Sequence, residues 1–153
     1  RELVVIGVRG PRVVPGGVNT GWWAPAADPA EVPPPERPFV LNVGEHLRSR
    51  ELLVAVAGAL ERDQPDARLE LVLGNWDWRP ELTRDNVHWN DRMSDAELLL
   101  KYRQASVVVL AVEDATFNNA LVEALACGKA VVAPDVGGVR EYTGDAARLV
   151  FFF

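Results

Sequence analysis

The chain has 153 residues, of which 48% are hydrophobic and 25% are charged, as in one globular domain that can bury a core of its own. Its formal net charge of −6 argues against a broad basic surface for nucleic acid or an anionic membrane. A small phosphorylated ligand is still compatible with this charge, because it needs only one or two arginines and some backbone N–H groups.

Cys127 is the only cysteine of the sequence, which excludes an internal disulfide framework and favours a reducing, cytoplasmic location. No apolar run approaches the ~18 residues that a transmembrane helix requires. The sequence opens at Arg1 without an initiator methionine and closes on the three phenylalanines 151–153. We therefore interpret it as a cytoplasmic piece of a longer protein.

Residues 1–38 are predicted to be an irregular segment and a proline-rich connector, because Gly and Pro crowd them and proline fixes φ and removes a donor. Residues 39–153 are expected to form the domain proper. Short apolar runs predict buried strands, and apolar residues at helical spacing predict helices. The strands are expected at 39–44, 69–74, 87–89, 107–112, 130–133 and 148–150, and the helices at 50–62, 94–104 and 117–127.

Strands that alternate with helices in units of ~30 residues predict βαβ crossovers. The expected fold class is therefore α/β: a Rossmann-like, three-layer domain with a mostly parallel sheet and helices on both of its faces. The second helix opens with Ser94 and Glu97, at the spacing of a capping box. Ligands of such sheets bind at the carboxyl ends of the strands, so the loops there are the candidate sites.

The loop after Val112 leads into the third predicted helix, whose free N–H groups would attract a diphosphate. Either Thr116 or Asn118 is expected to cap this helix. Glu123 is the only charged residue between Ala115 and Gly128. From spacing alone it is either a ligand of the site or a solvated glutamate on the outer face of the helix.

Residues 119–142, NALVEALACGKAVVAPDVGGVREY, resemble the donor-binding segment of the family 4 glycosyltransferases, which have the GT-B fold. In that family two acidic residues, separated by seven others, flank the start of this helix. The second falls on Glu123, which the resemblance implies would bind the ribose hydroxyls of a nucleotide. The first falls on Ala115, which cannot play that part, and Asp114 or Thr116 is the nearest substitute.

The resemblance implies that this chain is the nucleotide-sugar-binding half of a GT-B enzyme, with weaker similarity over residues 13–19, 39–44 and 86–110. It implies retaining, metal-independent transfer of a hexose from a nucleoside-diphosphate sugar, with UDP or GDP as the nucleotide. The acceptor domain would precede this chain, which we expect to be inactive alone. No cofactor or metal is expected, because His46 and His88 are isolated and no carboxylate pair has ligand spacing.

Two arginines follow Gly44. The family usually places an arginine directly after this glycine and a lysine some residues later, both for the donor phosphates. Here Glu45 occupies the first position, so Arg48 is the preferred phosphate ligand and Arg50 the second choice, because a guanidinium pairs oxygens bidentately and stays charged. The alternative is that both are surface arginines at a helix start.

Arg48 and Glu123 are the predicted catalytic residues. The predicted donor-binding residues also include Gly44, Arg50, Asp114, Thr116, Asn118, Asn119, Ala120 and Leu121, and the predicted base-binding residues are Trp89, Asn90 and Arg92. Trp89 could stack on a base, but a tryptophan at a strand end more often belongs to the core. The other four tryptophans, at positions 22, 23, 76 and 78, raise the question of contact with the absent domain or with a sugar.

Other classes fit less well. A non-catalytic nucleotide-binding module would explain Ala115, whereas an interaction module would explain exposed tryptophans but not the segment 119–123. An epimerase would want clustered carboxylates and histidines, and a dinucleotide-dependent oxidoreductase would carry a G-x-G-x-x-G motif after its first strand, which this sequence lacks. The sequence leaves the base, the sugar, the acceptor and the oligomeric state open.

Overall fold

The alternation of apolar runs and amphipathic segments folds into a parallel sheet flanked by helices. The computed structural model describes residues 16–73, 80–91 and 93–153. Within these residues the strands form a six-stranded sheet in the order β3-β2-β1-β4-β5-β6, and every neighbouring pair is parallel. The strands are β1 (Phe39–Val43), β2 (Arg68–Val72), β3 (Val87–Asn90), β4 (Val107–Val109), β5 (Val131–Ala133) and β6 (Val150–Phe152).

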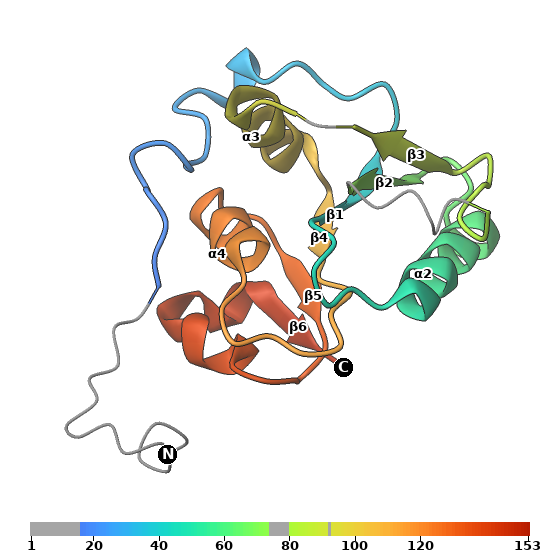
Figure 1. Ribbon diagram of the computed structural model, residues 1–153. Helices are drawn as coiled ribbons and strands as arrows, with labels where there is room; N and C mark the ends of the chain where they lie inside the picture. The colour runs from blue at the N-terminus through green and yellow to red at the C-terminus, as the bar shows by residue number, and fades with distance from the viewer. Residues whose placement is uncertain (1–15, 74–79, 92) are drawn as a thin grey trace, which may run out of the picture.

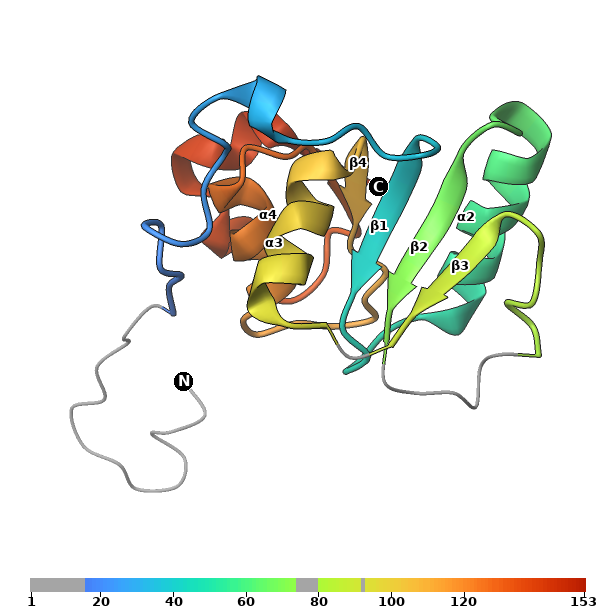
Figure 2. The same cartoon turned by 90° about the horizontal axis from the view of Figure 1, so that it is seen from above.

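In the described part of the chain, three α-helices cover the two faces of this sheet (Figures 1 and 2). They are α2 (Arg50–Asp63), α3 (Asp95–Gln104) and α4 (Asn119–Ala126). The apolar residues of α2, such as Leu53 and Ala57, pack on one face, whereas α3 and α4 pack on the other face around Leu41 and Val108. The prediction of a three-layer, Rossmann-like α/β domain is confirmed.

Local capping explains where the helices begin. Ser49 caps α2, and its side chain accepts a hydrogen bond from the N–H of Leu52. Ser94 and Glu97 form the predicted capping box at the start of α3. These contacts satisfy N–H groups that have no partner within the helix.

The direction of the strand order changes between β1 and β4. From β1 the chain runs outward to β2 and β3, and then returns through α3 to β4 on the other side of β1. Adjacent crossovers on opposite faces leave a crevice at the carboxyl ends of these two strands. The fold therefore places the loops after β1 and β4 side by side.

The described part of the N-terminal segment is irregular apart from one 3-10 turn, η1 (Pro29–Glu31). It is nevertheless attached to the domain: the Trp23 ring is buried and meets Tyr102 edge to face, with ring centroids 5.6 Å apart. Arg103 on α3 donates to the carbonyl of Ala24. Trp22 beside it is exposed, so the two neighbouring tryptophans have different environments.

Several boundaries differ from those predicted. The strand predicted over 107–112 ends at Val109, and beyond Leu110 the backbone bonds to the Arg48 loop instead: Arg48 forms an antiparallel bridge with Val112, and the N–H of Ser49 donates to the carbonyl of Ala111. The predicted strand 148–150 was wrong in its first part, because residues 144–149 form the 3-10 helix η4 and the strand begins at Val150. The predicted helix 117–127 is shorter, because Asn118 caps it.

Candidate functional site

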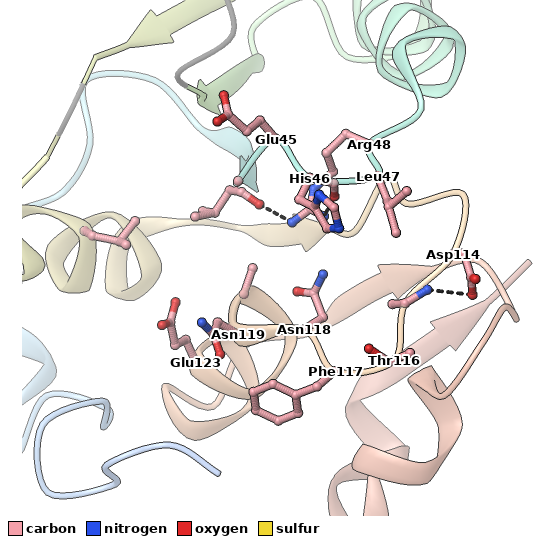
Figure 3. A pocket seen from close by; sticks show the side chains of 15 residues that line it. Glu45, His46, Leu47, Arg48, Asp114, Thr116, Phe117, Asn118, Asn119 and Glu123 are labelled. Carbon is pink, nitrogen blue, oxygen red and sulfur yellow. Dashed lines mark hydrogen bonds between the residues drawn. The ribbon is translucent and has the colours of Figure 1, made fainter. Parts of the chain in front are cut away.

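A cavity of about 660 Å³ opens at the carboxyl edge of the sheet, where the strand order changes direction. Residues 43–48 line one side of it and residues 114–120 the other, joined by Leu98 and Glu123. Figure 3 shows Arg48 across the cavity from Asn118, Asn119 and Glu123. This volume falls within the range of small-molecule sites, and the cavity lies where parallel sheets bind their ligands.

The loop after β1 is fixed to the end of β4 by backbone hydrogen bonds. The N–H of Ser49 donates to the carbonyl of Ala111 at 2.7 Å, and the N–H of Glu113 donates to the carbonyl of Leu47 at 2.9 Å. Leu47 has a positive φ of 51°, a conformation that costs a non-glycine residue about 1 kcal/mol or more. The two cavity loops are thus held together by main-chain contacts around a strained turn.

Hydrogen bonds to two backbone carbonyls fix the Arg48 side chain within this turn. Its guanidinium donates to the carbonyls of Val43 and His46, and the side chain is buried apart from its contact with the cavity. Gly44 makes room for it, since a Cβ there would lie 3.0 Å from Nη2 of Arg48. Burial lowers the pKa of the Arg48 guanidinium from its ordinary value, although the nearby Tyr102 raises it. Arg48 remains cationic near neutral pH.

Two of the five guanidinium N–H groups are used by these carbonyls. The Nε of Arg48 is buried and has no hydrogen-bond partner. A buried cation with unused donors favours an anion beside it, because its desolvation is then offset. Arg48, the predicted phosphate ligand, thus contributes a cation to the cavity wall, whereas its unpaired Nε–H is buried.

The first turn of α4 forms the opposite wall. The side chain of Asn118 accepts a hydrogen bond from the N–H of Leu121 at 3.1 Å, which identifies Asn118, rather than Thr116, as the helix cap. Asn118, Asn119 and Ala120 line the cavity, so the positive end of the helix borders it. Leu121 is fully buried in the core and does not line the cavity.

The loop that holds Ala115 is braced by a pair of glycines from another part of the chain. The N–H of Gly138 donates to the carbonyl of Ala115 at 2.7 Å. The N–H of Ala115 is bound by the carboxylate of Asp114 at 2.8 Å. Ala115, Asp114 and Thr116 all line the cavity. Ala115 stands where the family 4 glycosyltransferases have an acidic residue. It thus lies at the cavity wall but offers only a methyl group.

Glu123 is half-buried, lines the cavity and is anchored from behind by α3. The Tyr102 hydroxyl donates to Oε2 of Glu123 at 2.9 Å. Burial raises the pKa of Glu123 above its ordinary value, although the bond from Tyr102 lowers it, and Asp95 raises it further. Burial also raises the pKa of Tyr102 well above its ordinary value, with Glu123 adding to the effect. Glu123 is therefore not the solvated glutamate of an outer face.

Tyr102 was not singled out from the sequence. The available signal is its position on α3, four residues after Leu98 and three after Leu99 on the buried side of the helix. A hydroxyl on an apolar stripe needs a partner. That partner lies 21 residues away along the chain, on α4.

Other predicted residues lie outside the cavity lining. Arg50 is at the start of α2, where its guanidinium pairs with Glu51 and Glu81. Trp89 packs against the core on the α2 face and donates from Nε1 to the carbonyl of Leu82. These positions fit the alternatives of a surface arginine and a core tryptophan.

Asn90 and Arg92 are the other two predicted base-binding residues. Asn90 is buried, and its amide donates to Glu70 and to the carbonyl of Leu71, each at 3.4 Å. Arg92 lies outside the described residues, as do Trp76 and Trp78. The base-binding role of this region therefore stays a prediction.

Two features of the described ranges concern other kinds of site. No three His, Cys, Asp or Glu side chains in these ranges gather as metal ligands would. Across the same residues, no helix has both the length and the apolar character that crossing a membrane requires.

Comparison with known proteins identifies the family. Residues 37–151 match the family of glycosyl transferases group 1. The chain is 34% identical over 151 residues to a D-inositol 3-phosphate glycosyltransferase of Kineococcus radiotolerans, an alignment that covers 84% of this chain and 35% of that protein. This chain thus spans about a third of the length of that relative.

Solved structures have the same fold. Sucrose-phosphate synthase from Thermosynechococcus elongatus superposes with a TM-score of 0.69 at 27% identity, over 92% of this chain and 39% of that one. The Anabaena protein HepE, solved with UDP-glucose, superposes with a TM-score of 0.68 at 20% identity, over 90% and 43% of the two chains. The extent of the family match, together with these likenesses, establishes that the chain belongs to the group 1 glycosyltransferases, with the α/β architecture of their GT-B fold.

Proposed function

We propose that the cavity binds the nucleotide of a nucleoside-diphosphate sugar, and that this chain is the donor-binding part of a retaining hexosyltransferase. The observation that carries the proposal is the composition of the cavity walls. A buried guanidinium and the positive end of α4 border the same space as an anchored carboxylate. The first two suit a diphosphate, and the third suits the hydroxyls of a ribose, which donate hydrogen bonds to it.

Arg48 and Glu123 have different parts in this proposal. Glycosyl transfer from a nucleotide sugar releases a diphosphate, so negative charge develops on its oxygens and must be stabilised. Arg48 offers a fixed cation for that charge at the cavity wall, in concert with the first turn of α4. The proposed chemistry therefore needs no metal ion. Glu123 holds the nucleoside and positions the donor.

The acceptor is proposed to bind on a separate N-terminal domain, across the cavity mouth. The short span of this chain relative to its relatives supports that division. We further propose a cytoplasmic enzyme that uses UDP or GDP sugars, and we expect the 153-residue chain alone to be inactive. The UDP-glucose bound to the Anabaena protein makes UDP the first nucleotide to test.

Calorimetric titration of the chain with UDP, GDP and ADP tests the proposal. One nucleotide is expected to bind saturably, and Arg48→Ala and Glu123→Ala should each weaken it by about tenfold or more, which is about 1.4 kcal/mol. Arg50→Ala is the matched control, because its guanidinium pairs with Glu81 outside the cavity. Circular dichroism verifies the fold of each variant. The proposal fails if the folded chain binds none of the three at millimolar concentration.

A non-catalytic nucleotide-binding module is the second candidate, and Ala115 is the observation that favours it. The wall of the cavity has a methyl group where the resembling family has an acid. Donor hydrolysis by the full-length protein separates the two candidates. Turnover supports the enzyme, whereas nucleotide binding without turnover supports the module.

A further inference from the structure

We propose that Tyr102 is a positioning residue for the nucleotide: it holds one oxygen of Glu123 so that the other oxygen is presented to the ribose hydroxyls. This inference rests on the proposed function of the cavity. It assigns a role to a residue that does not line the cavity and acts through one that does.

Burial fixes the position of the Tyr102 side chain. Its side chain is fully enclosed within α3 and its neighbours, and its hydroxyl lies 2.9 Å from Oε2 of Glu123 on α4. Trp23 closes the other side of the ring at an interplanar angle of 89°. A phenol packed on both sides has one orientation, so its hydroxyl is a fixed donor.

A carboxylate only accepts hydrogen bonds, and it does so through two oxygens. Within the described residues, Tyr102 is the single hydrogen-bond partner of the Glu123 side chain. Oε1 therefore remains without a protein partner, on a residue that lines the cavity. A ligand hydroxyl that donates a hydrogen bond would complement Oε1. The bond between Tyr102 and Oε2 limits rotation of the carboxylate, so Oε1 stays directed toward the cavity.

The charged surroundings of Glu123 come from several elements. Asp95 on α3 disfavours its ionised form, as does burial, whereas the Tyr102 bond favours it. Cys127 caps the C-terminus of α4, and its thiol pKa is raised by burial and also by Glu123. Arg48 faces Tyr102 from the β1 loop. Glu45, His46 and Asp114 line the cavity that Glu123 borders. Loss of the Tyr102 hydroxyl therefore removes a contact that favours the ionised form of Glu123. That form is the one that accepts hydrogen bonds from ribose hydroxyls.

The experiment compares a ribonucleoside diphosphate with its 2′-deoxy and 3′-deoxy analogues, using the nucleotide that binds most tightly. Tyr102→Phe should weaken the ribonucleotide about tenfold and leave the deoxynucleotide that lacks the bound hydroxyl nearly unchanged. The ratio between the affinities for the ribonucleotide and for that deoxynucleotide should therefore fall toward one. The pH below which the ribonucleotide is released should also rise, because the pKa of Glu123 rises when its donor is lost.

Tyr142→Phe is the matched control, because Tyr142 is the other tyrosine of the sequence and contacts Phe117 through its ring. It should leave both affinities unchanged. Equal losses for ribo- and deoxynucleotides in Tyr102→Phe, or unchanged discrimination, would overturn the positioning role while the proposed function stands. Absence of binding to the folded wild-type chain would overturn the proposed function and the role of Tyr102 together.

Discussion

Lys101 on α3 extends its ammonium group onto the carboxylate of Glu70 on β2, and Glu70 is fully buried between helix and sheet. Arg68 pairs with the second oxygen of the same carboxylate at 2.6 Å. The Lys101 ammonium also lies 5.2 Å from the centre of the Phe39 ring. This ion cluster joins α3, which carries Tyr102, to strand β2 of the sheet.

Removing Lys101 from this cluster is expected to destabilise the protein, because it leaves a buried carboxylate with Arg68 as its only cation. Lys101→Met should lower the free energy of unfolding by about 3 kcal/mol, measured by urea denaturation. Arg84→Met removes an exposed ion pair with Glu61 and should cost less than about 1 kcal/mol. Equal effects of the two substitutions would contradict the structural role of Glu70.

Replacing Glu123 should stabilise the protein at neutral pH. Burial raises the pKa of Glu123 above its ordinary value of 4.5. Between the ordinary and the raised pKa, the folded state keeps a proton that the unfolded state has released, so the free energy of unfolding falls as the pH rises. Glu123→Gln should thus raise the melting temperature at neutral pH, and the gain should disappear below about pH 4.

Glu97 provides a control of opposite sign for that experiment. Hydrogen bonds from the side chain and backbone of Ser94 lower the pKa of Glu97, so its carboxylate stabilises the folded state above its ordinary pKa. Glu97→Gln should lower the melting temperature at neutral pH. Thermal unfolding across the pH range measures both variants, and a loss of stability in Glu123→Gln at neutral pH would contradict the argument.

Gly137 is expected to tolerate no side chain. Its φ is +52°, and a Cβ would lie 2.2 Å from the carbonyl oxygen of Ala115 and 2.4 Å from Oδ1 of Asp114. Gly137→Ala should therefore lower the free energy of unfolding by about 3 kcal/mol, from backbone strain and overpacking together. It should also weaken nucleotide binding, because the loop of the cavity must move.

Gly58 is the matched position for this test. It lies within α2 and a Cβ would meet nothing within 4 Å, so Gly58→Ala should stabilise the protein by up to about 1 kcal/mol. Chemical denaturation of the two variants gives the comparison. A Gly137→Ala protein as stable as the wild type would show that the two loops are not in close contact in solution.

The elements of the domain were accessible from the sequence because they depend on local patterns. Apolar runs located the strands, and the pairing of Ser94 with Glu97 located the start of α3. The cavity lies between two of the loops at the carboxyl edge of the sheet, where the parallel strands end. Where this reading failed, as at residues 110–112, a contact from the distant Arg48 loop had changed the local structure.

The choice among candidate residues depended on the tertiary structure. Arg48 and Arg50 are two positions apart, yet one enters the cavity and the other pairs with Glu81. The sequence offered Thr116 and Asn118 equally as the helix cap, and the structure shows that the side chain of Asn118 accepts a hydrogen bond from the N–H of Leu121. Orientation within a turn is set by packing against other elements, which no local pattern encodes.

The sequence by itself thus determined the α/β class and the approximate elements, because side-chain periodicity and capping act over a few residues. The tertiary structure alone decided the strand order, the bracing of Ala115 by Gly138 and the bond between Tyr102 and Glu123. Each of these joins segments that are far apart in the chain. Such contacts form only when burial of the shared core brings the segments together.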